Sequence, residues 1–254
     1  MDISNIFKKK KSNVVKNNIL ITDPHVPFSV VESYKSLRTN LLFSLSVAVD
    51  KKKTVIITSS NPGEGKSTAA VNLSIALSDA GNKTLLIDGD LRRPVIHSFL
   101  KLANDYGLSN VLAGFKKEDE VIKPYYELFD VILAGAAVPN PSELLSSEAM
   151  KNLLSRLEEK YDYIIIDTPP VNVVTDAIAL APFAAGVILM VKAESTSYPD
   201  LEKVLAQLEF SGVKIFGLVL NSAANKKHLI YSKYGFYGKY KSYGYKNYGY
   251  KGYN

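Results

Sequence analysis

Cysteine is absent from the 254 residues, which excludes disulfides, thiol catalysis and cysteine-based zinc sites. Long apolar runs are also missing. The longest run without a charge, residues 177–191, is interrupted by Pro182 and Gly186 and is too short to span a bilayer. The start, MDISNIFKKKKS, has no apolar segment after its charges, unlike a secretory signal. We therefore expect a soluble, cytoplasmic chain.

Acidic residues are missing from the end of the chain, YSKYGFYGKYKSYGYKNYGYKGYN (231–254), which holds nine tyrosines, five lysines and five glycines. With almost no aliphatic surface, this tail is not expected to fold alone. Its composition leaves three simple interpretations open: a flexible extension, an adhesive low-complexity segment, or an aromatic and basic strip on which bases stack.

Charge is divided unevenly along the chain. Residues 54–224 carry fourteen basic and twenty-one acidic residues, whereas residues 1–53 carry ten basic and four acidic ones and residues 225–254 carry seven lysines and no acid. A nucleic-acid enzyme usually places its positive charge on the folded face that grips phosphate, so no nucleic-acid partner is expected. Basic ends can instead meet an anionic membrane surface or the acidic body of a neighbouring copy.

Short β-branched runs alternate with longer helical patterns, which predicts an α/β fold. Because runs such as YIIID are apolar on both alternating faces, we expect a parallel sheet covered by helices on both faces. Helices are expected over 31–46, from Lys66, after Pro141 and from about Pro199. The predicted strands are 54–60, 84–88, 129–135, 161–167, 186–192 and 214–221.

A phosphate-binding loop follows the first predicted strand. The sequence SNPGEGKST (60–68) has the spacing of a P-loop, with Ser60 in place of the usual first glycine. Glycines let backbone N–H groups turn toward phosphate oxygens, and the start of the next helix favours negative charge. A lysine supplies a mobile charge and a serine hydroxyl can ligate Mg²⁺. The predicted nucleotide-binding residues here are Asn61, Pro62, Gly63, Glu64, Gly65, Lys66, Ser67 and Thr68.

Carboxylates follow two other predicted strands. LLIDGDLRR places Asp88 and Asp90 after the second strand, and YIIIDTPP places Asp167 after the fourth. Parallel α/β sheets gather ligands at the carboxyl ends of their strands, so all three carboxylates can converge on the phosphates. A hydrophobic strand ending in Asp has the form of a Walker B acid, although a polar strand cap or a surface turn would give the same residues.

These motifs together resemble those of the bacterial tyrosine kinases, P-loop enzymes that phosphorylate their own C-terminal tyrosine cluster and control capsule or exopolysaccharide synthesis. The resemblance covers nearly the whole chain. PGEGKST is similar to the family's Walker A motif, LLIDGDLRRP to its second acidic motif, called Walker A′, IIIDTPP to its Walker B motif, and NPSELL (140–145) to its loop motif. The tyrosine-rich tail completes the set.

The resemblance implies a role for each site residue, with ATP and Mg²⁺ as cofactors. Mg²⁺ is held by Ser67 with help from Asp88 and Asp167, while Lys66 serves the phosphates. Asp90, or alternatively Asp88, accepts the tyrosine proton, because a phenol of pKa about 10 is a poor nucleophile without a base. Arg92 or Arg93 neutralises charge on the transferred group. Asn221 meets the adenine edge or only caps its strand. The three histidines form no HRD motif of eukaryotic kinases.

The family's first helix carries E-x-x-R-x-x-R, which mediates ring-shaped self-association, whereas this chain has Glu32, Lys35 and Arg38. Lysine cannot reproduce the planar two-pronged contact of arginine with a carboxylate. A ring-shaped homo-oligomer is still expected.

The resemblance makes the tail tyrosines phosphate acceptors, used by a neighbouring subunit. Each phosphotyrosine adds about −1.5 to −2 charge, so roughly three cancel the tail's lysines and weaken its attraction to an acidic neighbour. A membrane adaptor that recruits and activates the kinase at the inner face of the membrane is implied, as is a cognate tyrosine phosphatase. The predicted acceptors are Tyr231, Tyr234, Tyr237, Tyr240, Tyr243, Tyr245, Tyr248, Tyr250 and Tyr253.

The predicted organisation is a basic extension (1–30), a P-loop kinase domain (31–228) and the tyrosine tail (229–254). Two other functions remain open. A MinD- or ParA-like positioning ATPase would share the sheet and the P-loop, but such proteins carry a lysine where this chain has Asn61. A nucleotide-gated scaffold would use the tail for binding by stacking.

Overall fold

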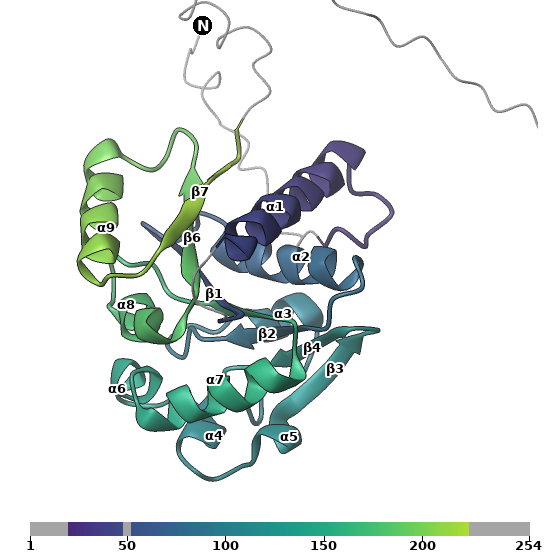
Figure 1. The fold of residues 1–254 in the computed structure, drawn as a ribbon, viewed down its shortest axis with the longest axis vertical. Helices are drawn as coiled ribbons and strands as arrows, with labels where there is room; N and C mark the ends of the chain where they lie inside the picture. The colour runs from purple at the N-terminus through teal and green to yellow at the C-terminus, as the bar shows by residue number, and fades with distance from the viewer. Residues whose placement is uncertain (1–19, 48–51, 224–254) are drawn as a thin grey trace, which may run out of the picture. The chain divides into compact units, whose positions relative to one another are not determined.

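A computed structural model describes residues 20–47 and 52–223 of the chain. In this part, seven strands form one sheet with the order β3-β4-β2-β5-β1-β6-β7 (Figure 1). All neighbouring strands are parallel except β3 and β4. The strands are β1 (Thr54–Ser59), β2 (Thr84–Asp88), β3 (Ile122–Tyr126), β4 (Phe129–Ile132), β5 (Tyr163–Asp167), β6 (Gly186–Lys192) and β7 (Ile215–Asn221).

The central strands are apolar on both faces, and this determines how the helices are placed. Val55 and Ile57 of β1 belong to the hydrophobic core on one face of the sheet, and Ile56 belongs to the core on the other. All residues of β1 and β2 are buried. A strand with two buried faces needs helices above and below it, so the sheet forms the middle of three layers.

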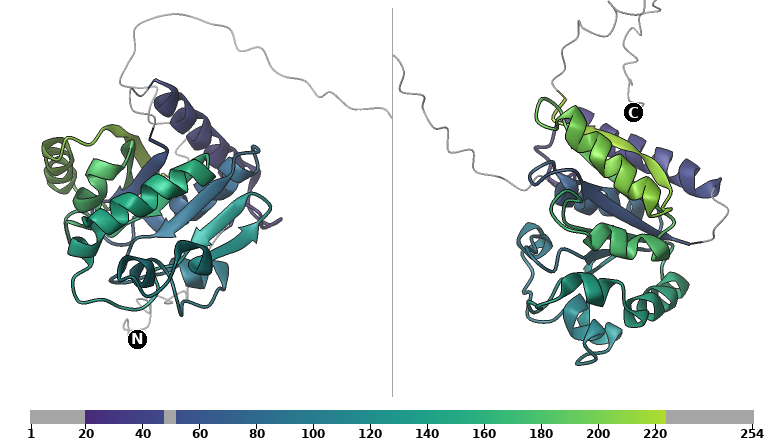
Figure 2. Two further views of the ribbon diagram at one scale, coloured as in Figure 1. Left: turned by 60° about the horizontal axis from the view of Figure 1, so that its bottom comes forward. Right: turned by 90° about the vertical axis from the view of Figure 1, so that its left-hand side faces the viewer.

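The helices divide between the two faces (Figures 1 and 2). The first layer holds α1 (Phe28–Ser46), α2 (Lys66–Ser78) and α3 (Ile96–Leu100). The second layer holds α4 (Leu108–Leu112), α5 (Glu118–Val121), α6 (Pro141–Leu145), α7 (Glu148–Lys160), α8 (Asp176–Leu180), the 3₁₀ helix η2 (Ala181–Phe183) and α9 (Tyr198–Phe210). These elements confirm the predicted α/β class and the helices on both faces.

Three local differences from the sequence prediction stand out. The edge strand β3 was not predicted, and its antiparallel pairing makes the sheet mixed rather than wholly parallel. The first helix begins at Phe28 instead of 31, and the helix expected after Pro141 is two helices. The second of them starts where the Ser147 side chain accepts a hydrogen bond from the Met150 N–H.

The strand order brings three loops together. Strand β5 lies between β1 and β2, although it comes much later in the sequence. In the parallel register Asp88, the last residue of β2, is paired with Asp167, the last residue of β5. The segments that follow β1, β2 and β5 therefore meet at one edge of the sheet, where α/β proteins bind ligands.

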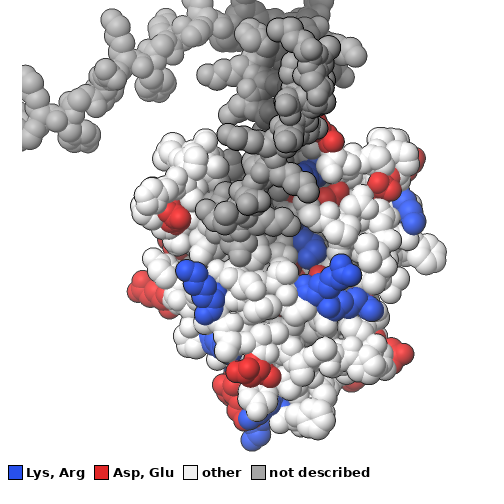
Figure 3. Space-filling view, turned by 180° about the vertical axis from the view of Figure 1, so that it is seen from behind, with Lys and Arg blue, Asp and Glu red and all other residues white. Residues whose placement is uncertain are grey.

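On the face seen from behind, Lys and Arg side chains lie nearer the centre and most Asp and Glu side chains lie at the margin (Figure 3). None of the helices in the two described ranges has the length and apolar character that crossing a membrane requires.

Candidate active site

The loop between β1 and α2 has the shape of an anion cradle. Gly63 and Gly65 adopt positive φ angles of +79° and +95°, and Gly65 is the residue that precedes α2. No side chain caps this end of the helix. The first N–H groups of α2 are therefore left for a ligand, at the end of the helix that favours negative charge.

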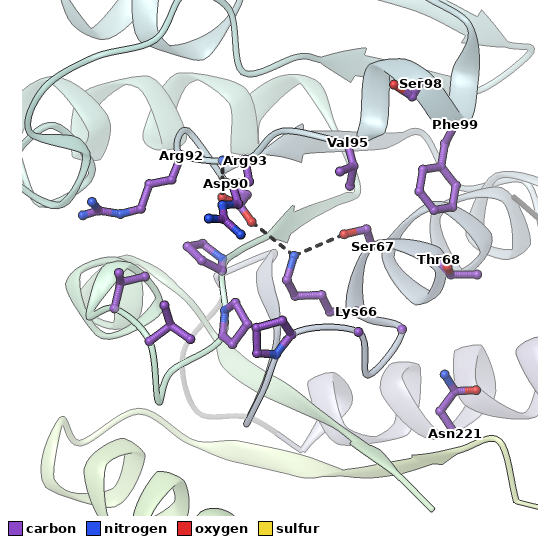
Figure 4. Close-up of a pocket in the computed structure, with 17 residues that line it drawn as sticks. Lys66, Ser67, Thr68, Asp90, Arg92, Arg93, Val95, Ser98, Phe99 and Asn221 are labelled. Carbon is purple, nitrogen blue, oxygen red and sulfur yellow. Dashed lines mark hydrogen bonds and ion pairs between the residues drawn. The ribbon is translucent and has the colours of Figure 1, made fainter. Parts of the chain in front are cut away.

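A cavity of about 890 Å³ opens beside this loop (Figure 4). Phe99, Val95 and Val173 give it apolar walls that the sequence did not single out, and the pair Pro169–Pro170 of the IIIDTPP motif adds to them. The predicted site residues that line the cavity are Pro62, Gly63, Gly65, Lys66, Ser67, Thr68, Asp90, Arg92 and Asn221. Asn61, Glu64, Asp88 and Asp167 are not among its lining residues.

Lys66 is the centre of the charged groups. Its Nζ lies 3.2 Å from the Ser67 Oγ and 3.3 Å from an Asp90 carboxylate oxygen (Figure 4). Asp167 Oδ1 lies 3.8 Å from the same Nζ. Burial alone would lower the pKa of Lys66, but Asp167, Asp90 and Asp88 outweigh it and raise the pKa. The ammonium group therefore stays charged at neutral pH, as binding a nucleotide's phosphates requires.

Asp167 is a buried carboxylate without a hydrogen bond. Its side chain is 0% exposed, and neither of its oxygens has a hydrogen-bond partner among the described residues. Burial raises the pKa of Asp167 to about 6, although Lys66 and Ser67 act in the opposite direction. Lys66, 3.8 Å away, is the charged partner of this carboxylate, and a bound cation would add the contacts that its two oxygens lack.

These groups fit a bound Mg²⁺. Mg²⁺ is typically held by one or two protein oxygen ligands together with phosphates and water, so a complete cage of acidic residues is not needed. The described ranges contain no cluster of three or more His, Cys, Asp or Glu that could hold a metal by itself. The free oxygens of Asp167 and the Ser67 hydroxyl beside Lys66 are groups of the right kind.

Asp88 and Asp90 have different surroundings, which the sequence could not distinguish. Asp88 is fully buried, and its two oxygens accept hydrogen bonds from the N–H groups of Asp90 (3.3 Å) and Ile96 (3.2 Å). Burial and the neighbouring Asp167 raise the pKa of Asp88 well above its usual range. Asp90 instead lines the cavity, with one oxygen on Lys66 and the other on the Arg93 N–H.

Arg92 is held by a partner that the sequence did not reveal. Its Nε and Nη2 donate to the two oxygens of Asp176 at 3.0 and 3.2 Å, and Nη2 also donates to the Ser142 hydroxyl at 3.0 Å. Asp176 is completely buried at the start of α8, and it raises the pKa of Arg92. Arg93 lines the same cavity, and its side chain makes no hydrogen bond or ion pair with the described part of the chain.

Three further predicted nucleotide-binding residues support the loop from outside the cavity or at its rim. The Glu64 carboxylate turns into the protein and accepts hydrogen bonds from the N–H groups of Ser60 and Asn61. The Asn61 amide donates to Asp200 at 3.1 Å. Asn221 lines the cavity and donates to the Glu64 carbonyl at 2.9 Å, so it supports the loop.

The residues predicted to drive self-association lie on α1. Lys35 and Glu32 form an exposed ion pair at 2.8 Å. Arg38 donates to the Ala76 carbonyl of α2 at 2.8 Å, which ties α1 to the body. The nine predicted acceptor tyrosines lie outside the described residues.

Comparison with known proteins first gives the class. Residues 52–215 match the family described as AAA domain. MinD from Pyrococcus horikoshii, solved with Mg-ADP, is 30% identical with a TM-score of 0.57, over 66% of this chain and 70% of that one. The domain is thus a P-loop nucleotide-binding domain.

The family follows from closer relatives. Tyrosine-protein kinase YwqD of Bacillus subtilis is 38% identical over 233 residues, which are 91% of this chain and 95% of that protein. The chimerical protein CapA2B2 is 40% identical with a TM-score of 0.73, over 78% of this chain and 86% of that one. The kinase domain of Escherichia coli ETK is 32% identical with a TM-score of 0.74, over 85% and 81%. The chain belongs to the bacterial tyrosine kinases.

This result confirms the family that the sequence motifs indicated, and with it the enzyme class of protein-tyrosine kinase. Some relatives are much longer. The chain matches only 31% of tyrosine-protein kinase etk of Escherichia coli, over 229 residues.

Proposed function

We propose that the chain transfers phosphate from ATP to tyrosines of its own C-terminal cluster, between neighbouring subunits, and thereby regulates the synthesis and export of a capsular or extracellular polysaccharide. The observation that carries this proposal is the meeting of Lys66, Asp90 and Asp167 beside an uncapped helix start, at the wall of a nucleotide-sized cavity. The nine tyrosines of residues 231–254 would be the acceptors of the transferred phosphate.

The chain's residues divide the work of phosphate transfer. The N–H groups at the start of α2 and the charge of Lys66 bind and orient the phosphates of ATP. Asp90 takes the phenolic proton of the acceptor, because it is the carboxylate that lines the cavity. Asp88 is less suited to this role, since backbone N–H groups already hold both of its oxygens. Ser67 and Asp167, with help from Asp88, would hold Mg²⁺, which when bound would supply positive charge to the phosphates.

Arg93 is the arginine that we assign to the transferred group. The neighbouring Arg92 is bound in a two-pronged contact to buried Asp176, so moving it would leave that carboxylate unpaired. The guanidinium of Arg93 makes no hydrogen bond or ion pair with the described residues, and Arg93 lines the same cavity. A free guanidinium can stabilise negative charge that develops during transfer.

The partners follow from the same proposal. A neighbouring subunit of a ring-shaped oligomer presents its tail, and α1 with Glu32, Lys35 and Arg38 takes part in the contact. Relatives such as etk, which is about three times as long as the matched region, support a membrane adaptor that is here a separate protein. That adaptor recruits the kinase to the inner face of the cell membrane, and a cognate phosphatase resets the tail.

The test is incubation of the purified chain with Mg-ATP, alone and with a candidate adaptor tail, followed by intact mass and peptide mapping of residues 229–254. We expect successive phosphate additions on tail tyrosines. The additions should disappear in the Asp167→Asn variant and in a variant with every tail tyrosine changed to phenylalanine. Phosphate additions that persist in the phenylalanine variant, or that are absent under all conditions, contradict the proposal.

A positioning ATPase of the MinD type is the second candidate, because the solved MinD structure shares the fold. It predicts that ATP is consumed while no phosphate is added to the chain. If ATP binds without being consumed and the tail captures a partner, the scaffold function stands instead.

A further inference from the structure

Glu64 is an unusual residue in the phosphate loop because its side chain is buried. It is 1% exposed, yet it pairs with no Lys, Arg or His in the part of the chain that the structure describes. Its carboxylate instead accepts the N–H of Ser60 at 2.8 Å and the N–H of Asn61 at 3.0 Å. A buried carboxylate is stable when it collects several hydrogen bonds, so Glu64 depends on these partners.

The third partner comes from a distant segment. The Thr196 hydroxyl donates to the other oxygen of Glu64, and the same hydroxyl accepts the N–H of Lys192 at 2.9 Å. Thr196 lies in the turn between β6 and α9, which belongs to none of the nucleotide-binding motifs. This turn contains Glu194 in a left-handed conformation, with φ of +59°. A turn with such a conformation is held by its surroundings.

The same turn is fixed to the cavity from a second direction. The Ala193 N–H donates to the Asn221 carbonyl at 2.9 Å, and the Asn221 amide donates to the Glu64 carbonyl at 2.9 Å. Glu64 is thus bound through its side chain and its backbone to two segments that are joined to each other. These hydrogen bonds link Glu64, the turn with Thr196 and Asn221 to one another, and all of them are made by the protein alone.

We propose that Thr196 is a positioning residue that, through Glu64, holds the phosphate loop in its nucleotide-binding shape. The Glu64 carboxylate accepts the N–H groups of Ser60 and Asn61, so these two donors are occupied within the protein. The first N–H groups of α2, in contrast, have no side-chain cap. Without the Thr196 contact the loop samples other conformations. Part of the free energy of nucleotide binding is then used to order the loop, and the affinity falls. This inference rests on the proposed nucleotide-binding function and adds a residue outside its motifs.

The test is a titration of the full chain with a fluorescent ADP analogue in the presence of Mg²⁺. Thr196→Val keeps the shape and removes the hydroxyl, and it should weaken nucleotide binding about three- to tenfold, the loss expected for part of one charged hydrogen bond. Thr196→Ser keeps the hydroxyl and should bind as the natural chain does. The rate of phosphate transfer at saturating ATP should change little, because the loop is ordered once it is filled.

The matched control is Thr84→Val. Thr84 is also buried, and its hydroxyl donates to the Asn82 carbonyl. It is the first residue of β2, so it lies at the amino end of the strands, whereas the nucleotide site lies at their carboxyl ends. It should lower stability without changing nucleotide affinity. Unchanged affinity in Thr196→Val, or equal losses in the Val and Ser variants, overturns the inference. If the natural chain itself binds no nucleotide, the proposed function fails as well.

Discussion

Replacing Asp167 by asparagine should stabilise the metal-free and nucleotide-free protein while it abolishes phosphate transfer. Asp167 is fully buried, and its pKa rises from the usual 3.8 to about 6 on folding. The folded protein therefore binds more protons than the unfolded chain between these pH values, and its stability falls as the pH rises through that window. Above pH 6 the cost is complete, and at 1.36 kcal/mol per pKa unit it amounts to about 3 kcal/mol.

The assay is urea unfolding in the presence of a chelator, at a series of pH values. At pH 7.5 we expect Asp167→Asn to gain about 2 kcal/mol, because the buried amide still lacks partners and returns part of the benefit. Near pH 4 the gain should be much smaller. Asp105→Asn, which alters an exposed carboxylate, is the control and should change stability by less than about 0.5 kcal/mol. A loss of stability at pH 7.5, or a gain that does not depend on pH, refutes the reasoning.

Two other predictions concern the loop and the arginine pair. Gly65→Ala should weaken nucleotide binding strongly, since the φ of Gly65 is +95° and its Cβ would meet the Asn221 side-chain amide, which supports the loop. Gly63→Ala meets no atom within 4 Å and should cost only about 1–2 kcal/mol of stability through its positive φ. Isothermal titration and urea unfolding distinguish the two variants. Asp176→Asn should lower the free energy of unfolding by about 2 kcal/mol, measured by urea unfolding, because it weakens the contact with Arg92. At a temperature where both arginine variants remain folded, kinase activity that falls more in Arg92→Ala than in Arg93→Ala would contradict our choice of arginine.

The sequence was sufficient for the parts of the site that depend on local order. The spacing of the P-loop and the acids at the ends of β2 and β5 predicted correctly which segments meet, because parallel strands align their carboxyl ends. The pairing of Arg92 with Asp176 was not predictable, since Asp176 lies at the start of α8, outside every motif and away from the end of any strand. The inward turn of Glu64 was missed for the same reason, as its partner Thr196 lies outside every motif.

The strand β3 was missed for a different reason. It contains Pro124 and a half-exposed pattern, and a proline is tolerated in a strand only at the edge of a sheet. Edge strands bury one side or none, so their sequences carry little of the hydrophobic signal that identified the central strands. The antiparallel direction of β3 likewise depends on its short connection to β4, which the sequence pattern did not show.

The position of β5 between β1 and β2 also bears on how the enzyme is made. Strand β1 carries the phosphate loop, yet both of its neighbours in the sheet, β5 and β6, are synthesised long after it. During synthesis, β1 has no hydrogen-bonded neighbour in the sheet until β5 has left the ribosome, since Thr54 pairs with Ile164. A nascent chain that has not reached Asp167 therefore has no assembled nucleotide site, and binding ATP becomes possible only after about two thirds of the 254 residues have been made.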